Sequence, residues 1–153
     1  MGLQPSLLVV EDDTLHRIIF AKVAQKLGFR VHLVTGAEEA IAALQARDCT
    51  CILLDLMLGS GSGEEVLRAV AGLAVKPSVI LISGAAQELV QDTVAFWTQS
   101  GIALLGPLRK PANVLEIRAM LEQVLGASTK ADESAPVEPS ASRPLRKAVE
   151  FEI

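Results

Sequence analysis

Five short apolar runs, separated by segments with helical periodicity, constrain the fold of this chain more than any other feature. The runs span residues 7–10, 31–34, 51–54, 79–82 and 102–105. They are continuous rather than alternating, which is typical of strands buried on both faces of a sheet. Between them, apolar residues recur at helical steps, as in Leu15, Ile19, Val23 and Leu27. The alternation predicts an α/β fold with a doubly wound, five-stranded parallel sheet.

The composition of the chain changes after about Leu125. Residues 126–153 are rich in Ser, Pro and Ala, which is typical of flexible linkers. We therefore expect one domain over residues 1–125, followed at 126–153 by a flexible tail or a truncated linker.

Charge and hydropathy exclude several kinds of protein. The 14 basic and 18 acidic residues give a net charge of −4, whereas general nucleic-acid binders usually carry a basic stripe. No apolar run approaches the roughly 18 residues that span a bilayer, and no basic segment followed by a long apolar one begins the chain. We expect a cytoplasmic protein that binds neither nucleic acid nor membranes.

Polar residues of a particular kind follow four of the five predicted strands. Glu11 and Asp12 follow the first strand, and Asp55 follows the third. Ser83 and Lys110 follow the fourth and fifth. Because the carboxyl ends of parallel strands share one edge of an open sheet, where ligands bind in such folds, we expect these side chains to converge there.

The converging residue types indicate phosphoryl transfer. Neighbouring carboxylates repel one another, and a hard cation such as Mg²⁺ relieves that repulsion while pairing with phosphate. A lysine and a serine hydroxyl can hold the remaining phosphoryl oxygens, and a carboxylate can act as the nucleophile. Each signal has a structural alternative, since Glu11, Asp12 and Asp13 also suit a helix N-cap and first turn. Their joint presence at four strand ends favours a functional site.

Four sequence strings resemble the receiver domains of two-component response regulators. They are LLVVEDD, CILLDLMLGSGSGEEVL, VILISGAA and LRKP, and the resemblance covers roughly residues 6–125. It implies the flavodoxin-like (βα)5 receiver fold with strand order 2-1-3-4-5. It also implies a sensor histidine kinase or a histidine phosphotransfer protein as partner, because the phosphoryl donor of such domains is a phosphohistidine.

The resemblance assigns roles to the site residues. Asp55 corresponds to the phosphoacceptor. Mg²⁺, or Mn²⁺ in its place, would be bound by Asp12 directly, by Glu11 through water, by Asp55 and by the backbone carbonyl of Met57. Ser83 and Lys110 would bind the phosphoryl group and act in the switch.

Three further positions carry expectations from the same resemblance. The peptide bond that precedes Pro111 is expected to be cis. Met57 and Ala85 lie where members of the family tune the lifetime of the phosphoryl group. Neither side chain can orient an attacking water by hydrogen bonding, so we expect slow self-dephosphorylation.

The chain also departs from the family pattern. Leu58 and Gly59 replace a common Met-Pro pair, and residues 104–108 contain no aromatic residue, so the aromatic switch of many members is absent or replaced. The stretch 101–110 is about two residues longer than usual. That stretch resembles the receivers joined to EAL-type cyclic-di-GMP phosphodiesterases, which would make an EAL-type domain the output.

These observations predict a signalling switch rather than an enzyme. The only reactions that such a switch catalyses are its own phosphorylation and dephosphorylation. The alternative is a pseudo-receiver, a binding module that is not phosphorylated. A phosphatase of the haloacid-dehalogenase type would need a second acid where Met57 stands. A homodimer through the fourth helix, fifth strand and fifth helix is a further expectation. Phe96, Trp97 and nearby leucines are the candidate contacts or core residues, and a core position is favoured for Trp97.

Overall fold

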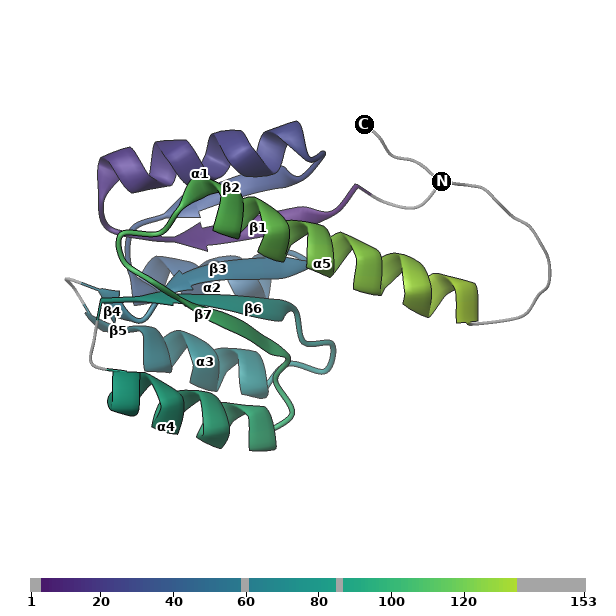
Figure 1. Cartoon of the computed structure of the whole chain (residues 1–153). Helices are drawn as coiled ribbons and strands as arrows, with labels where there is room; N and C mark the ends of the chain where they lie inside the picture. Colours follow the sequence, from purple (N-terminus) through teal and green to yellow (C-terminus); the bar gives the residue numbers. More distant parts are fainter. Residues whose placement is uncertain (1–3, 59–60, 85–86, 135–153) are drawn as a thin grey trace.

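The computed structural model describes residues 4–58, 61–84 and 87–134. Strands and helices alternate along the chain, and the larger strands form one sheet (Figure 1). In chain order the elements are β1 (Ser6–Val10), α1 (Thr14–Lys26), β2 (Arg30–Val34), α2 (Ala37–Ala46), β3 (Cys51–Asp55), β4 (Met57–Leu58), β5 (Gly61–Ser62), α3 (Gly63–Ala71), β6 (Ser78–Ser83), α4 (Gln87–Gln99), β7 (Leu104–Arg109) and α5 (Val114–Ser134).

The main sheet has five parallel strands in the order β2-β1-β3-β6-β7. Counted among the large strands alone, this is the order 2-1-3-4-5, so the predicted fold class is confirmed. Leu8 of β1 lies opposite His32 of β2 on one side and Ile52 of β3 on the other. The strand order reverses between β1 and β3, and in such sheets ligands bind at the carboxyl ends of the strands at this point.

Helices cover both faces of the sheet (Figure 1). Successive residues of a strand point to opposite faces, so Leu7 and Val9 pack with α1 and α5, while Leu8 and Val10 pack with α2, α3 and α4. Trp97 of α4 is buried on the face of the sheet that α2, α3 and α4 cover, as predicted. Both faces of the central strand β3 are therefore removed from water, which explains why its sequence is apolar without alternation.

The fifth strand of the sheet differs from the prediction, because it spans Leu104–Arg109 rather than residues 102–105. Its pairing with β6 steps from Ile80–Leu105 to Ile82–Leu108, so two residues of β7 face one residue of β6. This is the geometry of a β-bulge. It accommodates the extra length of this stretch and carries the strand on to Lys110.

Gly106 is the residue that permits the bulge. Its φ is +92°, and a Cβ atom there would lie 2.9 Å from the Leu108 nitrogen and 3.0 Å from the Leu81 oxygen. Only glycine adopts this conformation readily without a side-chain clash. The Gly106–Pro107 bond is cis, and so is the Lys110–Pro111 bond, as expected for the latter.

Helix α5 continues past Leu125 to Ser134, where the composition had predicted a flexible segment. In Figure 1 this helix projects beyond the sheet. The remainder of the predicted tail lies outside the described residues. None of the described helices combines the length and the apolar character needed to cross a membrane.

Candidate functional site

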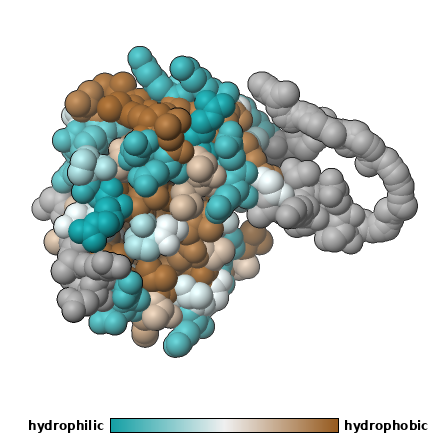
Figure 2. Space-filling model, viewed as in Figure 1, coloured by the Kyte–Doolittle hydropathy of each residue, from teal (hydrophilic) through white to brown (hydrophobic). Residues whose placement is uncertain are grey.

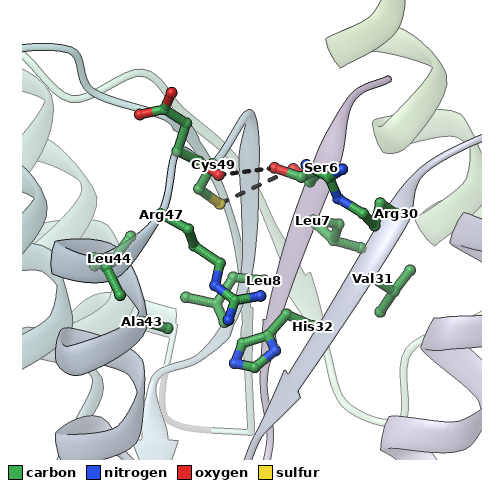
Figure 3. Close-up of a pocket in the computed structure, with 12 residues that line it drawn as sticks. Ser6, Leu7, Leu8, Arg30, Val31, His32, Ala43, Leu44, Arg47 and Cys49 are labelled. Carbon is green, nitrogen blue, oxygen red and sulfur yellow. Dashed lines mark hydrogen bonds between the residues drawn. The ribbon is translucent and has the colours of Figure 1, made fainter. Parts of the chain in front are cut away.

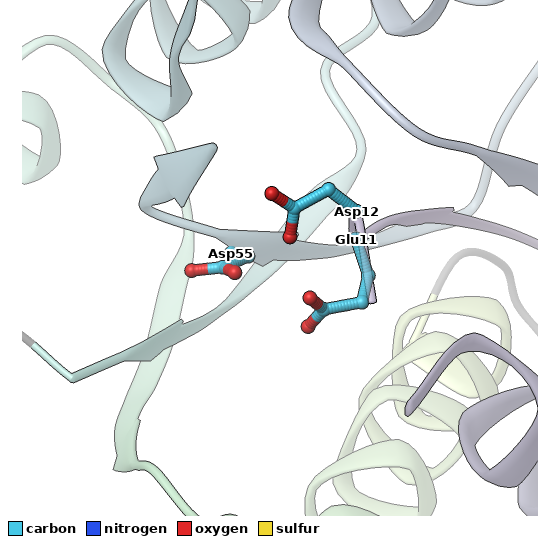
Figure 4. Close-up of side chains that lie close together, drawn as sticks. All are labelled: Glu11, Asp12 and Asp55. Atoms are coloured by element: carbon cyan, nitrogen blue, oxygen red, sulfur yellow. The ribbon is translucent and has the colours of Figure 1, made fainter. Parts of the chain in front are cut away.

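Three carboxylates meet at the carboxyl edge of the sheet. Glu11 and Asp12 follow β1, and Asp55 ends β3 (Figure 4). One oxygen from each lies within 4.8 Å of the others. Glu11 and Asp55 are only 1% and 2% exposed, whereas Asp12 is exposed. The sequence-based expectation that these side chains converge is confirmed.

Lys110 is the counter-ion of this cluster. Its Nζ lies 2.6 Å from Asp55 Oδ2 and 3.4 Å from both oxygens of Glu11. The ammonium comes from a residue 99 positions further along the chain than Glu11. It is placed by the end of β7, where the Lys110 amide donates a hydrogen bond to the Ser83 carbonyl at 3.1 Å. The bulge in β7 therefore determines where Lys110 lies.

The environment of the cluster shifts two pKa values. Burial is the largest influence on Glu11 and raises its pKa, and the negative charge of Asp55 adds to this effect. Burial alone would lower the pKa of Lys110. The hydrogen bond to Asp55 and the negative charges of Asp55 and Glu11 outweigh burial, so the pKa of Lys110 is raised. Lys110 is therefore held in its charged form, while two buried acids share one cation.

Asp13 does not belong to the cluster, and here the structural alternative holds. It is the N-cap of α1, where its side chain accepts a hydrogen bond from the His16 amide at 3.0 Å. That hydrogen bond is the main cause of its lowered pKa. The amide of Asp13 in turn donates to Glu11 Oε2 at 3.1 Å. The acidic trio thus divides into two site residues and one helix cap.

Ser83 and Met57, two further predicted site residues, lie beside the cluster. Ser83 is buried at the end of β6, one strand away from Asp55. The Met57 amide donates to Asp55 Oδ1 at 3.1 Å, and the Met57 side chain is 60% exposed. Ala85 lies outside the described residues.

Two residues beside the cluster were not predicted. His16 Nδ1 lies 3.9 Å from Glu11 Oε1, and its ring stacks on Phe20. Gly63, the first residue of α3, donates its amide to the Leu56 carbonyl at 3.0 Å. His16 could have been predicted to lie near the acids, because it is in the first turn of the helix that follows them. For Gly63, nothing in the sequence except its residue type indicated its role.

Gly63 lets α3 start directly against the backbone that carries Asp55. A Cβ atom on Gly63 would lie 2.8 Å from the Leu56 Cα and 2.9 Å from the Asp55 carbonyl oxygen. These contacts are with backbone atoms, which cannot move aside as a flexible side chain can. The short antiparallel pair β4–β5, which the sequence did not predict, connects Asp55 to this helix start.

We expect Gly63→Ala to lower the free energy of unfolding by about 2 kcal/mol, because the methyl group must displace backbone. Chemical denaturation measures the change. Gly126→Ala in α5 is the control, since its Cβ would meet nothing within 4 Å. The free energy of unfolding of that control is expected to rise by about 0.5–1 kcal/mol, because alanine has a higher helix propensity than glycine. A Gly63→Ala variant that is as stable as the wild type, or more stable, would contradict the tight packing.

The residues present fit a hard divalent cation. Three carboxylates supply oxygen ligands, two of them are buried, and one is exposed toward solvent. Mg²⁺ typically takes one or two carboxylates and keeps several waters, which an open, partly exposed cluster allows. The acidic cluster can therefore bind a metal ion.

Comparisons with known proteins agree with this geometry. The profile of the response regulator receiver domain matches residues 7–122. The acid tolerance regulatory protein ActR of Sinorhizobium medicae is 29% identical over 134 residues, which is 88% of this chain and 66% of ActR. The transcriptional regulatory protein ZraR of Klebsiella oxytoca is 28% identical over 93% of this chain but only 31% of its own length. The chain thus spans about two thirds of ActR and about a third of ZraR.

A solved structure shows the same fold. The CheY-like response regulator receiver domain protein from Methanospirillum hungatei superposes with a TM-score of 0.73 at 21% identity, over 84% of this chain and 99% of that one. With the family match over residues 7–122 and the acidic edge beside Lys110, the conclusion follows that this chain belongs to the response regulator receiver domain family.

Proposed function

We propose that this receiver domain accepts a phosphoryl group from a phosphohistidine onto Asp55, with Mg²⁺ bound at Glu11, Asp12, Asp55 and the Met57 carbonyl. The observation that carries the proposal is the 2.6 Å contact of Lys110 Nζ with Asp55 at the edge of a buried acidic cluster. A carboxylate surrounded by other acids and held by one lysine is suited to receive a phosphoryl group. Mn²⁺ can replace Mg²⁺ with the same ligands.

The transfer itself needs little covalent work from the protein. A carboxylate oxygen of Asp55 attacks phosphorus, the P–N bond to the donor imidazole breaks, and the imidazole leaves with that electron pair. A bound cation would neutralise negative charge on the phosphoryl oxygens. Lys110 would exchange its contact with Asp55 for one with a phosphoryl oxygen, and the Met57 amide would continue to orient the carboxylate.

The phosphorylated state would act as a switch. Phosphorylation adds about two negative charges and strong hydrogen-bond acceptors. Ser83 ends β6 directly before the segment that leads into α4, and Lys110 ends β7. Binding of both to the phosphoryl group would shift the population of conformers at α4, β7 and α5. In this proposal the chain would catalyse only its own phosphorylation and dephosphorylation at Asp55 and would not act as an enzyme on other substrates.

The lifetime of the phosphoryl group should be long. Met57 and Ala85 are apolar, so neither orients an attacking water by hydrogen bonding. We expect the phosphorylated domain to persist for minutes or longer in buffer with Mg²⁺, which loss of the added mass over time would measure. Decay within seconds would contradict this assignment.

Exposed apolar residues around the site offer a surface to the phosphodonor. Leu15 and Ile18 on α1 are 63% and 46% exposed, and Leu115 at the start of α5 is 73% exposed. Figure 2 shows apolar side chains in brown along the α1 side of the molecule. Both helices begin at the carboxyl edge of the sheet, where the acidic cluster lies. We propose that a sensor kinase or phosphotransfer protein docks on Leu15, Ile18 and Leu115.

Leu15→Asp is expected to slow phosphoryl transfer from a phosphorylated histidine protein at least tenfold, because it places a charge in an apolar contact. Phosphorylation by acetyl phosphate should be unchanged, since that small donor needs no docking surface. A radiolabelled phosphotransfer assay, with a histidine kinase that phosphorylates the wild type, gives the comparison. Val75→Asp, at an exposed residue in the loop between α3 and β6, is the control. Equal slowing of both variants would argue against this docking surface.

Output and assembly are further parts of the proposal. The relatives are regulators longer than this chain, so an output domain or partner is expected. An EAL-type domain is one such output, supported by the resemblance of residues 101–110 to receivers joined to such domains. A homodimer through α4, β7 and α5 would use the exposed Phe96, which packs edge-on against Trp97.

The proposal is tested by intact mass after incubation with Mg²⁺ and acetyl phosphate. The wild type should gain the mass of one phosphoryl group, and hydroxylamine should remove it, as expected of an acyl phosphate. Chelation of the metal with EDTA should prevent the gain. A folded protein that gains no mass with Mg²⁺ present would instead be a pseudo-receiver that signals by contacts alone.

A further inference from the structure

A cavity lies at the opposite end of the sheet from the acidic cluster. It has a volume of about 230 Å³ and lies between the first half of β2 and the end of α2. Figure 3 shows Arg47 and His32 pointing into the space between these two elements, with Arg30 at its rim. Apolar walls are formed by Leu8 and Leu44.

Two arginines and a histidine line this cavity. Arg30 and His32 are two residues apart on β2 and therefore share one face of the strand. Arg47 caps the C-terminus of α2 and reaches the cavity from the other side. Their grouping is unexpected in a chain whose net charge is −4.

These groups have no acidic partner among the described residues. No ion pair within 4.0 Å joins Arg30, His32 or Arg47 to a carboxylate in the part of the chain that the structure describes. Asp48 also lines the cavity but pairs with neither arginine there. Two guanidinium groups therefore line one cavity without a paired carboxylate, and a bound anion would neutralise their charge.

Helix capping does not account for this grouping. A cation at a helix C-terminus is favourable, which explains Arg47 taken alone. It does not explain why Arg30 and His32, on another element, face the same cavity. Arg68 lies in the last turn of α3, also near the C-terminus of a helix, but does not line this cavity, so it serves as a comparison for Arg47.

We propose that this cavity binds a small phosphate-type oxyanion, either free phosphate or the phosphate of a small monoester. Arginine forms charge-assisted, bidentate hydrogen bonds to phosphate, and His32 can add one donor. The volume is below the roughly 300–1,000 Å³ of pockets for drug-sized ligands, so the ligand must be small. Leu8 and Leu44 would contact the carbon atoms of an ester.

The test is a titration of the ¹⁵N-labelled full chain, followed by the backbone amide signals without Mg²⁺. Inorganic phosphate should shift the amides of residues 30–32 and 43–49 in a saturable manner, with a dissociation constant on the order of 1 mM or tighter. Sodium chloride at the same ionic strength should not. Glycerol 2-phosphate is the second probe: tighter binding than phosphate assigns the cavity to monoesters, and equal binding assigns it to the phosphate group alone.

Variants locate the binding. Arg47→Gln should weaken phosphate binding at least tenfold, and Arg68→Gln should leave it unchanged. Shifts that do not saturate, that spread over scattered basic residues, or that respond equally to both variants would overturn the proposal. So would shifts confined to Glu11, Asp55 and Lys110. Because the cavity and Asp55 lie at opposite ends of the sheet, failure here leaves the phosphoacceptor proposal unaffected.

Discussion

Asp55→Asn is expected to abolish phosphorylation, with incorporation of the phosphoryl group falling to the detection limit of intact-mass measurement. The amide has nearly the shape of the carboxylate but lacks the anionic oxygen that attacks phosphorus. Its single oxygen can still accept the hydrogen bond from Lys110, so only the one that the Met57 amide donates to the other carboxylate oxygen of Asp55 is lost. The variant should therefore remain folded, so the loss can be assigned to chemistry.

Asp13→Asn is the matched control for this substitution. Asp13 is the neighbouring acid that caps α1, and asparagine is as good an N-cap as aspartate. This variant should gain a phosphoryl group at the wild-type rate. An unchanged mass gain in Asp55→Asn would show that another residue accepts the phosphoryl group and would refute the assignment of Asp55.

The sheet and its acidic edge could be predicted because they depend on simple regularities. Strands buried on both faces read as continuous apolar runs, and the carboxyl ends of parallel strands meet at one edge. Glu11, Asp55 and Lys110 therefore had to lie close together once the five strands were placed in a parallel sheet. Burial then explains why the pKa of Glu11 is raised and why one lysine contacts two acids.

Features that depend on local backbone geometry could not be predicted. Residues 102–105 are as apolar as a strand, yet Ile102 is buried where α4 ends, with its amide donating to the Trp97 carbonyl at 3.2 Å. The strand begins at Leu104 and needs the bulge at Gly106 to reach Lys110. Hydrophobicity reports burial, but it does not distinguish a helix end from a strand.

Composition was also a weak guide to where the last helix ends. The stretch from Gly126 to Ser134 contains Ala, Lys and Glu, which favour helices as much as linkers. In the structure α5 extends through it. Residue type likewise could not show that Glu11 and Asp12 belong to the site while Asp13 caps α1, because acidic residues suit both a metal site and a helix N-cap.

Lys110→Met is expected to lower the free energy of unfolding by about 2–3 kcal/mol in the absence of divalent cations. Removal of one partner from a fully buried ion pair costs about 3–5 kcal/mol, because the remaining charge is left uncompensated. The expected loss is smaller here because Lys110 is 26% exposed. Chemical denaturation at neutral pH in EDTA measures the change. Lys76→Met is the control, since Lys76 is exposed and, among the residues that the structure describes, its ammonium donates a hydrogen bond to the Leu73 carbonyl and to no other group.

The difference between wild type and Lys110→Met should depend on pH in a defined way. The raised lysine pKa means that the contribution of Lys110 is fully present below its ordinary value of 10.5 and is lost as the pH rises through the higher folded-state value. On the acid side, the native state holds the proton of Glu11 at a pH where the unfolded chain has released it. As the pH falls through the raised pKa of Glu11, one of the two acids that Lys110 compensates becomes neutral. The stability difference should therefore be largest between these limits and should shrink on either side.

Magnesium provides a second, independent test of the same electrostatics. If the cost of Lys110→Met arises from uncompensated carboxylates, a cation bound by Glu11, Asp12 and Asp55 should offset it. Saturating Mg²⁺ should then raise the stability of the variant more than that of the wild type and narrow the gap at neutral pH. Equal stabilisation of both proteins would show that the lysine acts through packing of its aliphatic chain. A narrower gap would establish that Lys110 and the metal ion neutralise the same buried charge.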